Sequence, residues 1–319
     1  LENFLLDIEQ ISLINNQLFL ELPDGEHRLF DLDLALKREG SSRRLDATLF
    51  SRTSGTEISL VAHGVGSPAV RERFSGDLFI DVQNSDLESI QKFFPQDRGV
   101  QLTGEVDVQA WVAWEQGNPT IDVVLSGSDI NIRQSSGNWQ IPVDFVSLKT
   151  TLMERDERWT GFASDLELRK GNDVLLLPRI QFDMWGNSVR VRAARVPLEP
   201  VSAMVLGLDS SSEKIAEVLG TLQPKGQLSS VQLHIADYHQ PRVDWELTAD
   251  FAGLEVQSWR GAPGITGASG YVDLEPGGGL VMFDSHQFSM TFPTVYRDPL
   301  RFDDFYGTIH IDWNASDVV

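Results

Sequence analysis

The chain has 319 residues, of which 41% are hydrophobic, and this length and composition allow either two ordinary domains or one large β structure with a real core. Its formal net charge of −21 opposes binding to nucleic acid phosphates and to anionic membrane surfaces, because both would repel it. The absence of cysteine excludes disulfides, thiolate metal sites and cysteine nucleophiles.

No stretch approaches the roughly 18 to 20 apolar residues that a membrane-spanning helix needs. The first residues also lack the charged start and apolar centre of a signal peptide. Because the sequence begins in mid-pattern at Leu1 and stops at Val319 without a natural end, we expect it to be a piece of a longer chain. The nearest approach to a basic patch is Arg190, Arg192 and Arg195, which we interpret as a solvated strand face.

Alternation of apolar and polar residues is the dominant pattern and predicts β-strands with one apolar face. The clearest hairpin covers residues 102–125, where Val106, Val108 and Val112 face one way and Ile121 and Val123 repeat the pattern after the turn. Further strands are expected near residues 18–22, 30–36, 45–49, 58–62, 78–82, 130–132, 145–153, 159–168, 174–177, 179–184, 189–195, 227–235, 243–250, 268–274, 280–284, 287–292 and 305–313.

Helical spacing appears at only a few places, namely residues 85–94, 197–208 and 210–222. The first and last of these helices each precede a loop, an alternating strand, a turn with proline and a second strand. We interpret this likeness as a repeated module. The prediction is a β-groove segment at 1–84, a repeat module at 85–210 and a second repeat module at 211–319.

Runs of antiparallel hairpins build a sandwich, a closed barrel or an elongated open groove, and alternation alone does not separate the three. The stripes consist of small and medium apolar residues, and the helices are too few to cover a long sheet. We therefore predict a mostly β protein, with an elongated, strongly curved antiparallel sheet that forms an apolar groove. Such a groove suits acyl chains, since each buried CH2 contributes about 0.8 kcal/mol.

No motif for catalysis, nucleotide binding or metal binding is present. His234, Asp237 and His239 form the most metal-like cluster, but a polar turn explains them. Asp31 and Asp33 share an outward strand face, while Asp303 and Asp304 point to opposite faces, so neither pair suits acid–base catalysis. We predict no catalytic residue, no metal and no cofactor.

Four segments of the C-terminal half are specific enough to indicate a family. These are a Pro-x-Gly segment at 224–226, a Pro-Gly turn at 263–264 before the strand Gly270 to Leu274, the segment Phe292-Pro293 to Leu300, and a closing strand from Gly307 to Trp313. With these segments the chain resembles, over residues 75–313, the repeated region of the YhdP proteins, a branch of the AsmA-like family that also includes TamB.

The resemblance implies a large periplasmic protein of Gram-negative bacteria, anchored in the inner membrane, whose repeating β-groove carries phospholipid tails towards the outer membrane. It implies no enzyme activity, no nucleic acid partner, and contacts with both membranes through parts of the parent chain outside this one. The residues expected to contact lipid are Leu78, Ile80, Val82, Val106, Val108, Val112, Ile121, Val123, Leu125, Leu233, Ile235, Val243, Trp245 and Leu247.

Two alternatives remain open on the sequence. The first is a structural or adhesion-type β protein whose apolar faces close on one another and which binds other proteins through its surface. The second is an enzyme on a β scaffold, such as a polysaccharide hydrolase, for which no credible carboxylate pair is present.

Overall fold

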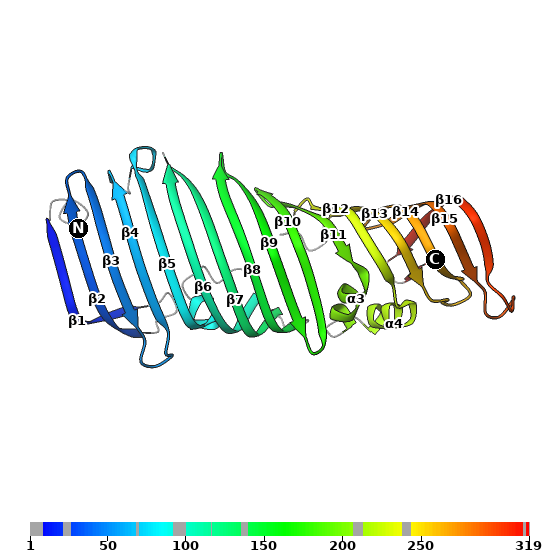
Figure 1. The fold of residues 1–319 in the computed structure, drawn as a ribbon, viewed down its shortest axis with the longest axis horizontal. Helices are drawn as coiled ribbons and strands as arrows, with labels where there is room; N and C mark the ends of the chain where they lie inside the picture. Colours follow the sequence, from blue (N-terminus) through cyan, green and yellow to red (C-terminus); the bar gives the residue numbers. More distant parts are fainter. Residues whose placement is uncertain are drawn as a thin grey trace. The chain divides into compact units, whose positions relative to one another are not determined.

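The computed structural model describes residues 9–21, 27–67, 70–91, 100–115, 117–134, 140–206, 213–237, 244–314 and 317–318. The chain divides into two compact units, Leu1–Asp156 and Glu157–Val319. Each unit is built on an antiparallel sheet in which consecutive strands pair with one another (Figure 1).

The described residues of the first unit form a sheet of eight strands, a 3-10 turn and one short helix. Its strands are β1 (Gln10–Glu21), β2 (His27–Glu39), β3 (Ser42–Phe50), β4 (Glu57–Val65), β5 (Ser75–Asp86), β6 (Val100–Glu115), β7 (Asn118–Gln134) and β8 (Gln140–Arg155), with η1 (Arg71–Arg73) and α2 (Leu87–Gln91) on either side of β5. Helix α2 packs on β5 and β6.

The second unit is also an antiparallel sheet, and its described residues include two helices between the third and fourth strands. Its elements are β9 (Arg158–Lys170), β10 (Asp173–Trp185), β11 (Ser188–Pro197), α3 (Leu198–Leu206), α4 (Glu213–Leu222), β12 (Lys225–Ile235), β13 (Trp245–Val256), β14 (Gly264–Glu275), β15 (Gly278–Thr291), β16 (Leu300–Asn314) and β17 (Asp317–Val318). Helix α3 packs against β10, β11, β12 and α4.

The predicted mostly β, antiparallel and curved architecture is confirmed. The expected helices appear as α2, α3 and α4, although residues 92–94 and 207–212 lie outside the described part of the chain. Two details differ from expectation. Segments 174–177 and 179–184 form the single strand β10, which continues through Pro178, and segments 280–284 and 287–292 form the single strand β15.

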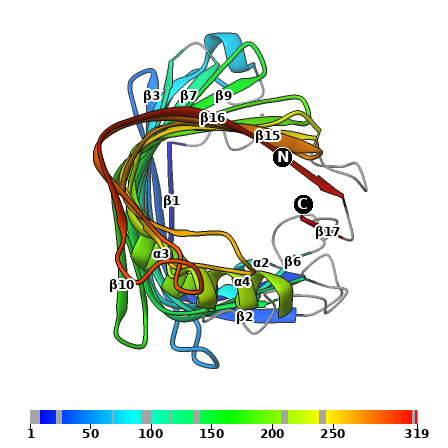
Figure 2. The same ribbon diagram turned by 90° about the vertical axis from the view of Figure 1, so that its right-hand side faces the viewer.

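The strands of each unit bend along their length, as Figure 2 shows, and β-bulges contribute to this bending. At a bulge one strand carries an extra residue, which increases the local twist and bends the strand. The register shifts once between β1 and β2, once between β5 and β6, and twice between β12 and β13. A residue with positive φ lies at each of these shifts, and these residues are Asn15, Asn84, Gly226 and Ser230.

Two of these bulges are held by an aspartate on the neighbouring strand. The backbone N–H of Asn84 donates a hydrogen bond of 2.8 Å to Asp107, and that of Asn15 donates one of 2.6 Å to Asp33. A backbone donor that leaves the ladder must find another partner. The outward-facing Asp33 therefore has a structural role.

The described residues of the second unit contain an aromatic core. Phe251, Ala268 and Phe288 are its buried members. Phe288 stacks on Phe305 with ring centroids 4.4 Å apart, and Phe283 meets Phe251 edge-on at 5.7 Å. This cluster fixes β13 to β16 against one another. None of the helices described is both long and apolar enough to cross a membrane.

The bulge at Asn84 leads to a stability prediction. Its φ of 51° is open to glycine but costs a β-branched residue about 1–2 kcal/mol. We expect Asn84→Gly to leave the free energy of unfolding within about 0.5 kcal/mol of wild type and Asn84→Val to lower it by about 1–2 kcal/mol. Denaturant unfolding of both variants measures this. Equal stability of the two variants would contradict the positive-φ assignment.

Candidate functional site

Cross-strand pairing in the first unit aligns apolar side chains into three continuous rows that run from β2 to β8. Residues paired directly across neighbouring strands share a face and touch. The rows are Leu36, Leu45, Ala62, Leu78, Val112, Ile121 and Leu152, then Leu34, Ala47, Leu60, Ile80, Ala110, Val123 and Thr150, then Leu32, Leu49, Ile58, Val82, Val108, Leu125 and Leu148. We call the face that carries these rows the apolar face of the first unit.

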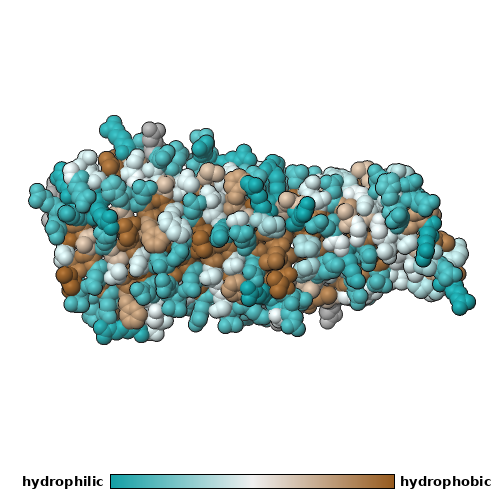
Figure 3. Space-filling model, viewed as in Figure 1, coloured by the Kyte–Doolittle hydropathy of each residue, from teal (hydrophilic) through white to brown (hydrophobic). Residues whose placement is uncertain are grey.

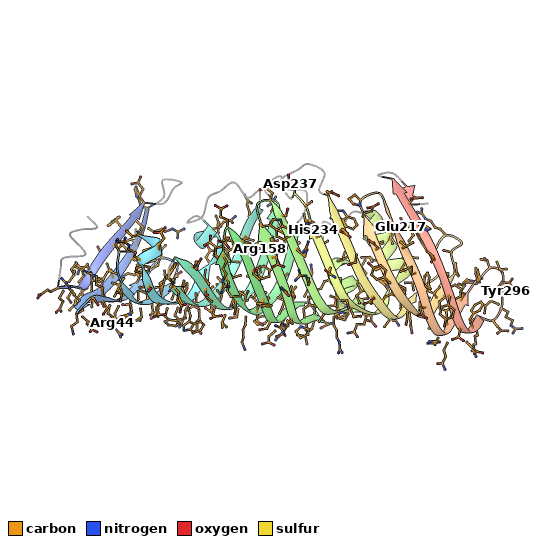
Figure 4. The ribbon with its side chains drawn as sticks, turned by 90° about the horizontal axis from the view of Figure 1, so that it is seen from above. Arg44, Arg158, Glu217, His234, Asp237 and Tyr296 are labelled. Atoms are coloured by element: carbon orange, nitrogen blue, oxygen red, sulfur yellow. The ribbon has the colours of Figure 1, made fainter. Side chains whose placement is uncertain are left out.

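The apolar face lies on the inner side of the bend. Arg44, which precedes Leu45 of the first row and so points the opposite way, is labelled in Figure 4 on the outer side of the strands. Most residues of the rows are half-buried, and Leu32 is only 8% exposed. The rows are therefore crowded by their neighbours on the inside of the curve without being covered by a second layer of described residues.

The opposite face of the first unit carries mainly polar and acidic residues, among them Asp77, Asp81 and Asp107. It is interrupted by a short apolar row in which Val61 pairs with Phe79, and Phe79 with Trp111. Figure 3 shows hydrophobic residues along the middle of the strands of this unit and hydrophilic residues towards the strand ends. The two faces thus differ in the continuity of their apolar surface.

Electrostatic pairing on the opposite face is local. Arg44 donates hydrogen bonds of 2.9 and 2.8 Å to the two carboxylate oxygens of Asp46. These bonds lower the pKa of Asp46 and raise the pKa of Arg44. Both side chains are well exposed, so the pair contributes little to stability and keeps this carboxylate charged.

The second unit carries an equivalent apolar face. One row crosses it through Gly161, Phe182, Val191, Leu233, Leu247, Leu274, Gly279 and Ile311, and a shorter row consists of Trp159, Met184, Val189, Ile235 and Trp245. A Cβ placed on Gly161 would lie 2.2 Å from the ring of Phe182. The missing side chain therefore makes room for the large aromatic ring on the next strand.

The helices of the second unit lie within the curve of its strands, as Figure 2 shows for α3 and α4. Two contacts fix the position of α4. Arg260 of the β13–β14 connection pairs with Glu217 of α4 at 3.2 Å, and Gln257 donates a backbone hydrogen bond of 2.8 Å to Leu222. The helices therefore occupy part of the inner side of this unit, where α3 lies next to β10, β11 and β12 and α4 packs on α3.

The expected lipid-contacting residues fall into these rows, with two exceptions. Val106 is 3% exposed, packed beside the bulge and the side chain of Ile130, so it supports the face from within. Val243 lies outside the described residues. The others are placed as follows: Leu78, Ile80, Val82, Val108, Val112, Ile121, Val123 and Leu125 in the first unit, and Leu233, Ile235, Trp245 and Leu247 in the second.

Further members of the same rows were not predicted from the sequence. In the first unit these come from β2 to β4, for example Leu34, Leu45 and Leu60, whose alternation was visible but whose register was not. In the second unit Phe182 and Val191 were omitted. Alternation within a strand shows which residues share a face, but only cross-strand register shows that the faces join.

The other candidate sites do not gather into a centre for chemistry. Asp31 is bonded to Arg52 at 2.6 Å, and Asp304 is bonded to His286. His239 lies outside the described residues, and in the ranges that are described no three side chains of the metal-binding types come together.

Comparison with known proteins identifies the family of the chain. The family model described as "YhdP protein" matches residues 1–318. The chain belongs to the YhdP family. A relative from this family is the "Intermembrane phospholipid transporter YhdP" of Escherichia coli (strain K12), 21% identical over 254 residues, with 74% of this chain and 19% of the transporter covered. The chain thus spans about a fifth of the length of this YhdP relative. No solved structure matches it.

The adjacent valines Val123 and Val124 provide a matched test of the apolar face, because Val123 belongs to a row and Val124, 36% exposed, points to the opposite face. We expect the wild-type chain to bind a fluorescent apolar dye, since its rows are accessible. Val123→Asp should reduce the dye signal severalfold because it places a charge in the middle of the rows. Val124→Asp should leave it nearly unchanged. Equal effects of the two substitutions, with circular dichroism unaltered, would show that the dye binds elsewhere.

Proposed function

We propose that this chain is a segment of a periplasmic, bridge-like lipid transfer protein. In this proposal its apolar faces form a groove that shields the acyl chains of phospholipids between the inner and outer membranes, which supports the outer-membrane barrier. The observation that carries the proposal is the continuity of the three apolar rows from β2 to β8. Membership of the YhdP family and similarity to an intermembrane phospholipid transporter support the same function.

The chemistry of the rows suits acyl chains better than a specific small molecule. Thr150 is the only polar side chain in the three rows, so hydrogen bonding to a ligand has almost no place there. Burial of hydrocarbon contributes about 0.8 kcal/mol for each CH2 without any requirement on direction. A surface of this kind binds chains of different lengths and lets them move along it.

The dimensions of one unit also fit. Neighbouring strands lie about 4.8 Å apart, so the rows of the first unit extend for about 29 Å. The hydrocarbon core of a bilayer is about 30 Å thick, so the chains of one leaflet occupy about 15 Å. A single unit therefore has length for an entire acyl chain, with the charged head group left in water.

The rest of the proposal concerns the parent protein. It performs no catalysis, is anchored in the inner membrane, and contacts both membranes through parts of the parent chain outside this one. Its body consists of repeat modules, with 1–84, 85–210 and 211–319 as the modules present here. The order of α2 before β6 and β7, and of α4 before β12 and β13, supports this division.

The alternative of a closed-core structural protein is less well supported. A closed core requires a second layer over the rows, but among the described residues of the first unit β1 and β8 do not pair with one another, and α2 is the only α-helix. The rows remain half-exposed. An exposed apolar surface of this extent marks a binding site in a protein that is otherwise strongly acidic.

Photocrosslinking tests the proposal at single positions. A photoreactive amino acid at Val123 or Leu233, both in the rows, should form adducts with phospholipid when the protein is made in Gram-negative cells, and mass spectrometry of the extracted protein identifies them. The matched positions Val124 and Gln232, which point to the opposite faces, should give few or no adducts. Adducts at equal yield on both faces, or no adduct at Val123 in folded protein, would contradict the proposal.

A further inference from the structure

The face of the second unit opposite to its apolar rows carries a group of arginines, which is unusual in a chain with a net charge of −21. Register places Trp185 opposite Arg158, Asp183 opposite Arg190, and Gln181 opposite Arg192. Arg179 joins this group, with its guanidinium 5.4 Å from the ring of Phe162. We call Arg158, Arg179, Arg190 and Arg192, together with Trp185, the arginine cluster.

A buried carboxylate holds two members of the cluster. Asp183 is 4% exposed. Its Oδ1 lies 3.5 Å from Nη2 of Arg158, and its Oδ2 lies 3.3 Å from Nη2 of Arg192. Thr160 donates a further hydrogen bond to it at 3.3 Å. One negative charge thus faces two positive ones, and positive charge remains on the surface.

An aromatic ring holds a third arginine. The guanidiniums of Arg158 and Arg190 lie 5.2 and 5.3 Å from the ring centroid of Trp185, within the range of cation–π attraction. The imidazole of His234 stacks on the same ring, with the two centroids 5.8 Å apart. The cluster is therefore organised before any partner arrives, and binding loses less side-chain entropy.

The guanidinium groups of the cluster still have N–H groups that can donate hydrogen bonds to a partner. Each carries five N–H groups in a planar fork that matches a carboxylate, and the contacts to Asp183 use one nitrogen on Arg158 and one on Arg192. Arg158 and Arg192 keep 51% and 36% of their side-chain surface exposed. Beside them is an open hollow of about 420 Å³, lined by Arg179, Gln181, Arg192 and Gln232 among others.

We propose that the arginine cluster is a docking surface for a short acidic segment of a partner protein. Arginine and tryptophan are the residue types that dominate the binding energy of protein interfaces, and the charge of the cluster is complementary to carboxylates. An anionic membrane is the poorer fit, because a bilayer surface would also meet the acidic remainder of the chain. A short peptide meets only charges within about one Debye length, roughly 8 Å at physiological salt.

A short poly-glutamate peptide with a fluorescent label tests this proposal by anisotropy with the 319-residue chain. We expect binding that weakens as salt is raised and no binding of the matching poly-glutamine peptide. Arg179→Gln combined with Arg190→Gln should weaken binding by roughly 3- to 30-fold. This pair leaves the contacts of Asp183 intact, so the fold is retained.

The control is Arg44→Gln combined with Arg52→Gln in the first unit, which changes the net charge by the same amount. It should leave peptide binding unchanged. Equal loss in both double variants, or no binding by the wild-type chain, would overturn the proposal, as would binding to vesicles of anionic phospholipid but not to the peptide. Both double variants should keep their phospholipid crosslinks at Val123, so failure here is distinct from failure of the proposed lipid function.

Discussion

Cross-strand register is the constraint on which the rest of the structure depends. Because side chains alternate along a strand, a slip of one residue between two strands would move every apolar side chain of one strand to the opposite face. The pairs Leu60 with Ile80, and Ala110 with Val123, exist only in the register observed. The register of the cross-strand hydrogen bonds therefore determines whether the apolar faces of the separate strands join into one continuous apolar surface.

Bulges reconcile this register with a bent sheet. At the bulge of Asn84 the alternation of side chains between the two faces of β5 shifts by one residue. The next residue after Val82 on the apolar side is therefore Ser85, which is buried and pairs with Val106. The extra residue bends the strand, and Asp107 satisfies the donor that the ladder loses. Curvature and continuity of the apolar face thus come from the same β-bulge, in which one residue, here Asn84, has a positive φ.

Local pattern was sufficient to predict most strands, the three helices and the face on which Val108 and Val112 lie. It was insufficient wherever the answer depends on a neighbouring strand. Proline normally ends a strand, yet Pro178 lies within β10, where Leu177 and Arg179 on either side of it keep their pairing with β9. The arginine cluster was missed for the same reason, because Arg190 and Arg192 look like a solvated face until Asp183 and Trp185 are placed beside them by register.

The uniformity of the apolar rows has a kinetic consequence. A ligand held by hydrogen bonds must break them all before it moves, which creates a free-energy barrier at every step. If the proposed function holds, an acyl chain displaced along a row by one strand spacing would exchange a Leu for an Ala, an Ile or a Val and would meet no polar group until Thr150. Its binding free energy would then be nearly independent of position, so it would slide along β2 to β8 without fixed stopping points.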